Sequence, residues 1–320
     1  MASLGGVVLL SLLVGARSLP VTTVWQALTT SCDTPECLIV QSSRVPRTLA
    51  GISVGMALGV AGLLMQQLTR NPLADPGILG INAGASAALV LGLSIWEVTR
   101  PDALIGLACL GALLAALGVT LLGFSQGRHV DPVRMTLSGV ALGAVLEGLS
   151  SGLALLVPDA FDYMRFWQAG TLDTRNLPMT LLTLLPITAG LGLALTLIRP
   201  LRALALGDEV MLSLGTSARR TRLLGIVAIT LLCGSATACV GPIAFIGLMM
   251  PPIARRIAGP DPAALLLWTL LLTPLLLLSA DILGRILIPG ELRVSVVTAL
   301  IGAPLLIYWV RRMQLTGGVR

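Results

Sequence analysis

Few residues of this 320-residue sequence have the types and spacing that catalysis or metal binding requires. His129 is the only histidine, and no set of carboxylates gathers around it in the sequence. The sequence therefore offers no candidate for a Ser-His-Asp triad, a zinc site or a hydrolase site. All 21 basic residues are arginine, so the lysine that a P-loop places on nucleotide phosphates is missing. We expect no catalytic residue, metal ligand or cofactor in this chain, and any ATP must bind to a partner.

The most unusual charged residue is Glu147, which lies near the middle of the otherwise uncharged stretch 135–158. An ionised carboxylate at the centre of a membrane helix costs about 2.5–3.5 kcal/mol on insertion scales. Small and polar residues at four-residue steps place this glutamate on one helix face. They are Gly139, Gly143, Glu147 and Ser151. The face is typical of close helix packing, but it also suits a carboxylate on a water-filled pathway, and both interpretations stay open.

The five cysteines form no metal-binding pattern. Cys109, Cys233 and Cys239 fall within apolar stretches, where we expect them to be small packing residues. Cys32 and Cys37 lie close together in a segment that we expect on the outer side, where the compartment is oxidising. The sequence therefore permits a Cys32–Cys37 disulfide in an outer loop, and two free thiols are the alternative.

Long apolar segments must position these residues. Apolar residues make up 55% of the chain and charged residues 11%, whereas a soluble domain has about 25% charged residues. Uncharged runs of about 20 residues match the length of a helix that crosses the hydrocarbon core of a membrane. Only helices satisfy all backbone polar groups within one such segment. We predict an all-α integral membrane protein with about ten transmembrane helices in a single domain, residues 1–320.

The expected helices follow the uncharged runs, with Gly241-Pro242 dividing a run that is too long for one crossing. Their predicted ranges are 2–16, 48–68, 77–95, 103–123, 134–157, 177–198, 220–240, 243–258, 263–287 and 294–310. A short amphipathic segment, 159–169, is expected on the outer surface, and the arginine-rich loop 199–222 is the longest cytoplasmic connection. Residues 1–16 lack the basic start of a signal peptide, so we interpret them as a retained helix.

The arginines also predict the orientation. Thirteen fall in the loops of one side and eight in the loops of the other, so the positive-inside rule places the first side, with both termini, in the cytoplasm. The first helix disagrees locally, because Arg17 falls on the outer side. This rule also accounts for the net charge of +6, so nucleic acid is not an expected partner, whereas membrane lipids are.

Five motifs follow one another along nearly the whole chain. They are Arg44-Val45-Pro46-Arg47-Thr48-Leu49 leading to Asn71-Pro72-Leu73-Ala74-Asp75-Pro76-Gly77; Leu137-Ser138-Gly139-Val140-Ala141-Leu142-Gly143; Leu204-Ala205-Leu206-Gly207-Asp208-Glu209; Gly241-Pro242-Ile243-Ala244-Phe245-Ile246-Gly247-Leu248; and Ser279-Ala280-Asp281, Glu291-Leu292 and Val297-Thr298-Ala299-Leu300-Ile301-Gly302-Ala303-Pro304. In order and spacing, these motifs resemble those of the FecCD/BtuC family of ABC importer permeases, which move ferric siderophores, haem and cobalamin. Two departures are Pro252, where the family usually has histidine, and Glu147, where small residues are usual.

The resemblance implies a type II ABC importer permease fold in the cytoplasmic (inner) membrane. Two permease subunits, identical or different, would assemble with two ATP-binding ATPase subunits and an extracytoplasmic substrate-binding protein. The pathway would run between the permease subunits, lined partly by their fifth and tenth helices. The expected cargo is a large chelate, a ferric siderophore before haem or cobalamin. The alternative class is an ATP-independent secondary transporter, which usually has charges or broken helices at the membrane midplane.

The resemblance also implies roles for particular residues. The arginines that would receive carboxylates of the binding protein are Arg44, Arg47 and Arg285. For Arg285 the alternative is an i,i+4 pair with Asp281, and for the other two it is contact with lipid headgroups.

On the cytoplasmic side, the segment 203–216 resembles the coupling segment that docks into the ATPase. Its candidate residues are Gly207, Asp208, Glu209 and Gly215. Acidic residues suit the start of such a short helix, and Gly215 could end it, but a simple surface helix would look the same. The residues similar in position to the family's cytoplasmic gates are Asn71, Leu73, Asp131, Pro132 and Val133. Asn-Pro and Asp-Pro are also ordinary turn starters.

Overall fold

The computed structural model describes residues 2–15, 19–29, 34–123, 132–173, 177–213, 215–288 and 290–317. The regular elements in these ranges are all helical, which confirms the all-α prediction for them. They are α1 (Ala2–Leu13), α2 (Val21–Thr29), α3 (Pro35–Ile39), the π-helical turn η1 (Val40–Arg44), α4 (Val45–Thr69), the 3₁₀ turn η2 (Pro76–Leu79), α5 (Ile81–Ser94), α6 (Pro101–Gly123), α7 (Pro132–Leu156), α8 (Pro158–Trp167), α9 (Leu177–Thr196), α10 (Ile198–Ala205), α11 (Asp208–Ser213), α12 (Ala218–Val240), α13 (Ile246–Ala258), α14 (Pro262–Leu287) and α15 (Val294–Gly317).

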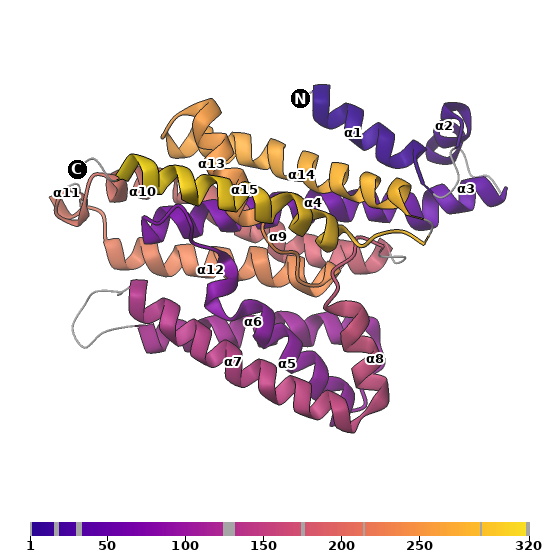
Figure 1. The fold of residues 1–320 in the computed structure, drawn as a ribbon, viewed down its shortest axis with the longest axis horizontal. Helices are drawn as coiled ribbons and strands as arrows, with labels where there is room; N and C mark the ends of the chain where they lie inside the picture. Colours follow the sequence, from indigo (N-terminus) through magenta and orange to yellow (C-terminus); the bar gives the residue numbers. More distant parts are fainter. Residues whose placement is uncertain are drawn as a thin grey trace.

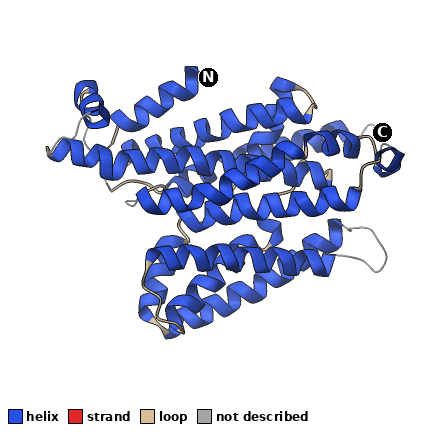
Figure 2. Ribbon diagram, turned by 180° about the vertical axis from the view of Figure 1, so that it is seen from behind, coloured by secondary structure: helices blue, strands red, loops and turns tan. Residues whose placement is uncertain are grey.

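The long helices lie roughly parallel to one another, and α4 lies among them (Figure 1). It packs against α14, α12, α13 and α9. A second group, α5, α6 and α7 with the short α8, lies on one side and contacts the rest mainly through α12. Figure 2 shows the same two groups from behind, with helices as the regular structure of the described residues.

Glycines allow α4 to approach its neighbours closely. Gly55 faces α14, where an added Cβ would lie 2.6 Å from the Cα of Pro274. Gly62 faces the start of α13, where an added Cβ would lie 1.9 Å from the carbonyl oxygen of Gly247. Small residues at such crossings let two backbones meet, which is how membrane helices gain packing energy without a hydrophobic driving force.

The helices that could cross a membrane are identified by their length and composition. Within the described ranges, five helices are long and apolar enough to cross a membrane, or six if α9 and α10, which bend by 48°, count as one span. Apolar helices that are shorter than this limit include α1, α5 and the first part of α15. The expected number of about ten is therefore confirmed only as a multi-helix, membrane-spanning architecture.

Several helix boundaries differ from the prediction. The helix expected from residue 48 begins at Pro35 and continues through η1 into α4, because Arg44 and Arg47 are buried inside the structure instead of ending the helix. The helix expected at 2–16 ends at Leu13, and the unpredicted α2 follows it. The helix expected at 177–198 ends at Thr196, and α10 continues in a new direction.

Two of the expected helices are shortened by irregular segments. Residues 70–80 lead from α4 through η2 into α5, and residues 241–245 lead from α12 into α13. Phe245, a non-glycine residue, has a positive φ of 69° at the second break. Both breaks face the middle of α4, since Leu58, halfway along that helix, lies beside residues from each. The two family motifs that contain Asp75 and Phe245 therefore meet in space.

Candidate docking, coupling and pathway sites

The predicted docking residue Arg47 is held by two carboxylates. Its Nη2 donates to Oδ1 of Asp281 at 2.8 Å, and its Nε donates to Oδ2 at 3.1 Å. Its Nη1 donates to Oε2 of Glu291 at 2.7 Å. Asp281 is only 1% exposed and also accepts a hydrogen bond from Nη2 of Arg285. One buried carboxylate thus joins two arginines from opposite ends of the sequence.

The other predicted docking residues, Arg285 and Arg44, hold the end of α1. Nη1 of Arg285 donates to the carbonyl oxygens of Ser11, at 2.9 Å, and Val14, at 3.0 Å. Nη1 of Arg44 donates to the carbonyl oxygen of Leu12 at 2.6 Å. The last carbonyls of a helix have no partner within it, and cations are favourable there because of the helix dipole. The arginines therefore fix α1 against α14 and η1.

Burial changes how the docking expectation must be understood. Arg44, Arg47 and Arg285 are 5%, 6% and 6% exposed, so they do not project from the surface as a simple docking patch would. The i,i+4 ion pair between Arg285 and Asp281, the alternative reading of that arginine, is present. A cavity of about 240 Å³ is lined by the three arginines together with Glu291. This cavity gives a partner's carboxylate a route to the cluster.

The coupling segment folds into two short helices. In the second, α11, Glu209 and Val210 are exposed while Met211 is fully buried. Leu206, between α10 and α11, is 67% exposed. Gly207 has a φ of 117° and Gly215 a φ of 70°, with open space around both. The backbone of Asp208 starts α11, whereas its side chain lies outside the described part of the structure. The segment therefore exposes apolar and acidic side chains, while the buried side chain of Met211 holds it against the rest of the chain.

Two contacts tie α10 to the rest of the chain. Nη2 of Arg70, at the end of α4, donates to the carbonyl oxygen of Leu204 at 2.7 Å. Nε of Arg202 donates to Oδ1 of Asp261, the N-cap residue of α14, at 2.7 Å. This hydrogen bond lowers the pKa of the Asp261 carboxyl below its ordinary value. These contacts hold α10 against the end of α4 and the start of α14.

The predicted gate residues lie in different settings. Asn71 starts a turn after α4, where its Oδ1 accepts from the backbone N–H of Leu73 at 3.0 Å. Leu73 is 36% exposed. The structure thus shows an Asx turn at this position, and a gating role stays a prediction. Asp131 lies outside the described residues. Pro132 and Val133 begin α7, but nothing is described of their side chains.

Glu147 is exposed on α7, and only 17% of the most apolar stretch of this helix is buried. The four-residue row divides along the helix. Gly139 is buried and Gly143 lies 4.0 Å, measured from an added Cβ, from the Cβ of Ala83, whereas Glu147 and Ser151 are exposed. The packing interpretation therefore suits the two glycines. The glutamate lies on a face that this chain leaves uncovered.

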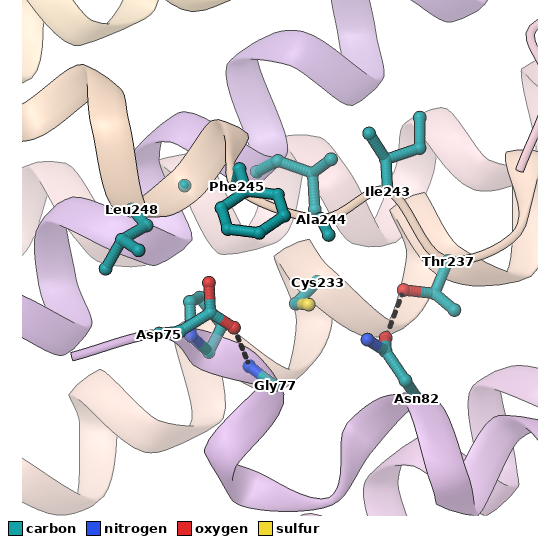
Figure 3. Close-up of a pocket in the computed structure, with 12 residues that line it drawn as sticks. Asp75, Gly77, Asn82, Cys233, Thr237, Ile243, Ala244, Phe245 and Leu248 are labelled. Carbon is teal, nitrogen blue, oxygen red and sulfur yellow. Dashed lines mark hydrogen bonds between the residues drawn. The ribbon is translucent and has the colours of Figure 1, made fainter. Parts of the chain in front are cut away.

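A cavity of about 270 Å³ lies between the two helix breaks, with a mainly apolar lining that includes the polar side chains of Asp75, Asn82 and Thr237 (Figure 3). Oδ1 of Asp75 accepts from the backbone N–H of Gly77 at 2.7 Å. Oδ1 of Asn82 accepts from the hydroxyl of Thr237 at 2.9 Å. Sequence reasoning did not single out this cavity. The two Gly/Pro-containing motifs that interrupt apolar runs were visible in the sequence. That they lie side by side was not, because the contact joins residues far apart in the sequence.

The cysteines separate into two environments. Cys109, Cys233 and Cys239 are free; the last two are buried and Cys109 is partly buried. Cys37 is buried and disulfide-bonded. Its predicted partner, Cys32, lies outside the described residues, so the Cys32–Cys37 pairing stays a prediction. In the part of the chain that the structure describes, no group of His, Cys, Asp or Glu side chains could hold a metal ion.

The long, partly uncovered apolar helices define a polytopic membrane protein. Comparison with known proteins specifies the class further. The model of the FecCD transport family matches residues 4–312, and the chain belongs to this family.

Three similar proteins illustrate the relationship. The ferric enterobactin transport system permease protein FepD of Escherichia coli is 56% identical over 95% of this chain and 91% of its own length. The Fe(3+)-citrate import system permease protein YfmD of Bacillus subtilis is 36% identical over 95% and 90%. A solved inward-facing metal-chelate type ABC transporter superposes with a TM-score of 0.85 at 26% identity, covering 97% of both chains.

Proposed function

We propose that this chain is the membrane-spanning permease subunit of an ATP-binding-cassette importer for a ferric siderophore. The observation that carries the proposal is the 56% identity to a ferric enterobactin permease over 95% of the chain. The aligned region is nearly the whole chain and not a single apolar span. The chain itself hydrolyses nothing, and ATP binds to a separate ATPase subunit.

The topology that supports this function has ten spans in one domain. They are α1, α4, α5, α6, α7, α9, α12, α13, α14 and α15. Five of these qualify by length and composition alone, and the short α5 and α13 cross together with the irregular segments that precede them. The excess of arginine in alternate loops favours cytoplasmic termini in the inner membrane.

The partners follow from the surfaces. The exposed faces of α7 and α15 suit a second permease subunit, with Glu147 beside the pathway between the two. Leu206, Glu209 and Val210 suit a groove on an ATPase subunit. The arginine cluster and its cavity suit carboxylates of an extracytoplasmic binding protein, because a guanidinium binds a carboxylate through two hydrogen bonds.

The test is reconstitution of the permease with its ATPase and binding protein in lipid vesicles. ATP-dependent uptake of radioiron-labelled ferric enterobactin is expected, with little competition from haem or cobalamin. Equal uptake of cobalamin or haem would replace the siderophore assignment while keeping the importer class.

The alternative class, an ATP-independent transporter, is favoured by one observation. Broken helices at a midplane binding site are typical of secondary transporters, and the structure has a cavity between two helix breaks with Asp75 in its lining. Uptake by vesicles that hold the permease alone, driven by a proton or sodium gradient, would establish this alternative. Absence of uptake without the ATPase supports the importer.

A further inference from the structure

The two carboxylates that hold Arg47 differ in how easily they could be exchanged. Asp281 is 1% exposed, binds Arg47 through both oxygens and also binds Arg285. The side chain of Glu291 is 35% exposed and makes a single contact to Nη1 of Arg47. Asp281 is therefore a fixed part of the core. Glu291 is the partner that solvent or another protein can replace.

The backbone around Glu291 is held in an unusual conformation. Glu291 has a φ of 57° and follows Gly290, which has a φ of 107°. Non-glycine residues rarely adopt a positive φ unless surrounding contacts impose it. The contacts here are the hydrogen bond from the Glu291 N–H to the Ile288 carbonyl, at 3.2 Å, and the ion pair to Arg47. Loss of the ion pair would leave this loop with less to hold it.

The loop leads directly into α15. The Leu292 N–H donates to the carbonyl oxygen of Gly284 at 2.9 Å, which keeps the loop against α14. Nη1 of Arg293 donates to the carbonyl oxygen of Phe166 in α8 at 3.2 Å, and its guanidinium lies 5.2 Å from the centre of that ring. The next residue, Val294, begins α15. Only Leu292 and Arg293 separate Glu291 from α15, the helix that is proposed to line the pathway.

We propose that Glu291 occupies the place of a partner's carboxylate on Arg47 until the extracytoplasmic binding protein docks. This inference rests on the proposed function. On docking, a carboxylate of the binding protein enters the cavity, takes over Nη1 of Arg47 and displaces Glu291. The released loop, residues 290–293, then frees the start of α15. Because coupling free energies are reciprocal, any change that loosens this loop also strengthens docking.

Charge balance supports the exchange. Arg47 and Arg285 are balanced by Asp281 and Glu291 while the loop is closed. Departure of Glu291 leaves Asp281 as the one described carboxylate paired with Arg47 and Arg285, in a cavity of about 240 Å³ that Arg44 also lines. The positive charge that is then unbalanced favours entry of another carboxylate. The exchange also explains why arginines that match the family's docking arginines are buried and paired in the isolated chain.

The experiment compares docking to the assembled complex in lipid nanodiscs for wild type, Glu291→Gln and Glu97→Gln. Glu97 is a matched control, because it is exposed and also has a positive φ, 49°, but no described contact joins it to the arginine cluster. Glu291→Gln keeps the side-chain size and removes the competing charge. We expect it to bind the binding protein about tenfold more tightly than wild type, which corresponds to about 1.4 kcal/mol. Glu97→Gln should bind as wild type does.

A second measurement needs no variant. Hydrogen exchange at the backbone amides of Glu291 and Leu292, both hydrogen-bonded in the closed loop, should become faster when the binding protein docks to wild type. Equal affinity of Glu291→Gln and Glu97→Gln, or unchanged exchange of these amides on docking, would overturn the exchange and leave the proposed function standing. Failure of wild type to bind any such protein would overturn both.

Discussion

Among the described glycines, Gly62 makes the closest approach to another backbone, which allows a quantitative prediction. At Gly62, an added Cβ would lie 1.9 Å from the carbonyl oxygen of Gly247 and 2.6 Å from its Cα. These atoms belong to the backbone at the start of α13, so no side-chain rotation can make room. Overpacking of a core costs about 1–3 kcal/mol, occasionally more. Because α4 and α13 must separate as units, we expect Gly62→Ala to cost about 3 kcal/mol, at the upper end of this range.

The assay is thermal unfolding of the purified protein in detergent, with all variants heated at one rate because membrane proteins often unfold irreversibly. A cost of this size should lower the unfolding midpoint by about 5 °C or more. The control is Gly192→Ala in α9, where an added Cβ meets nothing within 4 Å. If Gly62→Ala unfolded at the same temperature as Gly192→Ala, the close contact between α4 and α13 would be wrong.

Three further predictions concern the sites. A cysteine at Glu147, in a background without the native free cysteines, should react with a water-soluble thiol reagent in the assembled complex; complete protection throughout the transport cycle would assign the residue to packing. Reversal of Asp208 and Glu209 to arginine should uncouple ATP hydrolysis from uptake while membrane insertion survives, and unchanged transport would count against the coupling segment. The Arg202 hydrogen bond lowers the pKa of Asp261, so this pair is kept at neutral pH and lost only in acid, as pH falls through the lowered pKa. ATPase activity of the complex should therefore show no titration by this pair between about pH 6 and pH 8, and a neutral titration that disappears in Asp261→Asn would contradict the contact.

Helix starts were predictable where proline or charged residues directly precede an apolar run. The helices α6, α7, α12 and α14 begin within two residues of the expected 103, 134, 220 and 263, because proline or charged residues precede apolar runs there. The predicted start of the helix that contains α4 was wrong, because the charged residues before position 48 were taken to mark the end of the membrane segment. Arg44 and Arg47 are instead satisfied by partners inside the fold.

The arginine site shows where local reasoning stops. The pair of Arg285 and Asp281 was recognisable from its i,i+4 spacing. The pair of Arg47 and Asp281 joins residues 234 positions apart, and no periodic pattern in the sequence predicts a contact over that separation. The same limit applies to the cavity beside Asp75, since it forms only when two breaks from distant motifs meet at α4.

The uncovered face of α7 has a consequence for biogenesis. A single copy inserted alone would expose Glu147 to acyl chains, at a cost of about 2.5–3.5 kcal/mol if the carboxylate stays ionised. In the assembly proposed above, pairing with a second subunit around water would remove this cost, so by mass action the pair would be favoured over the single chain. In that assembly one carboxylate would supply a thermodynamic check on stoichiometry, because surplus single copies would remain the less stable form.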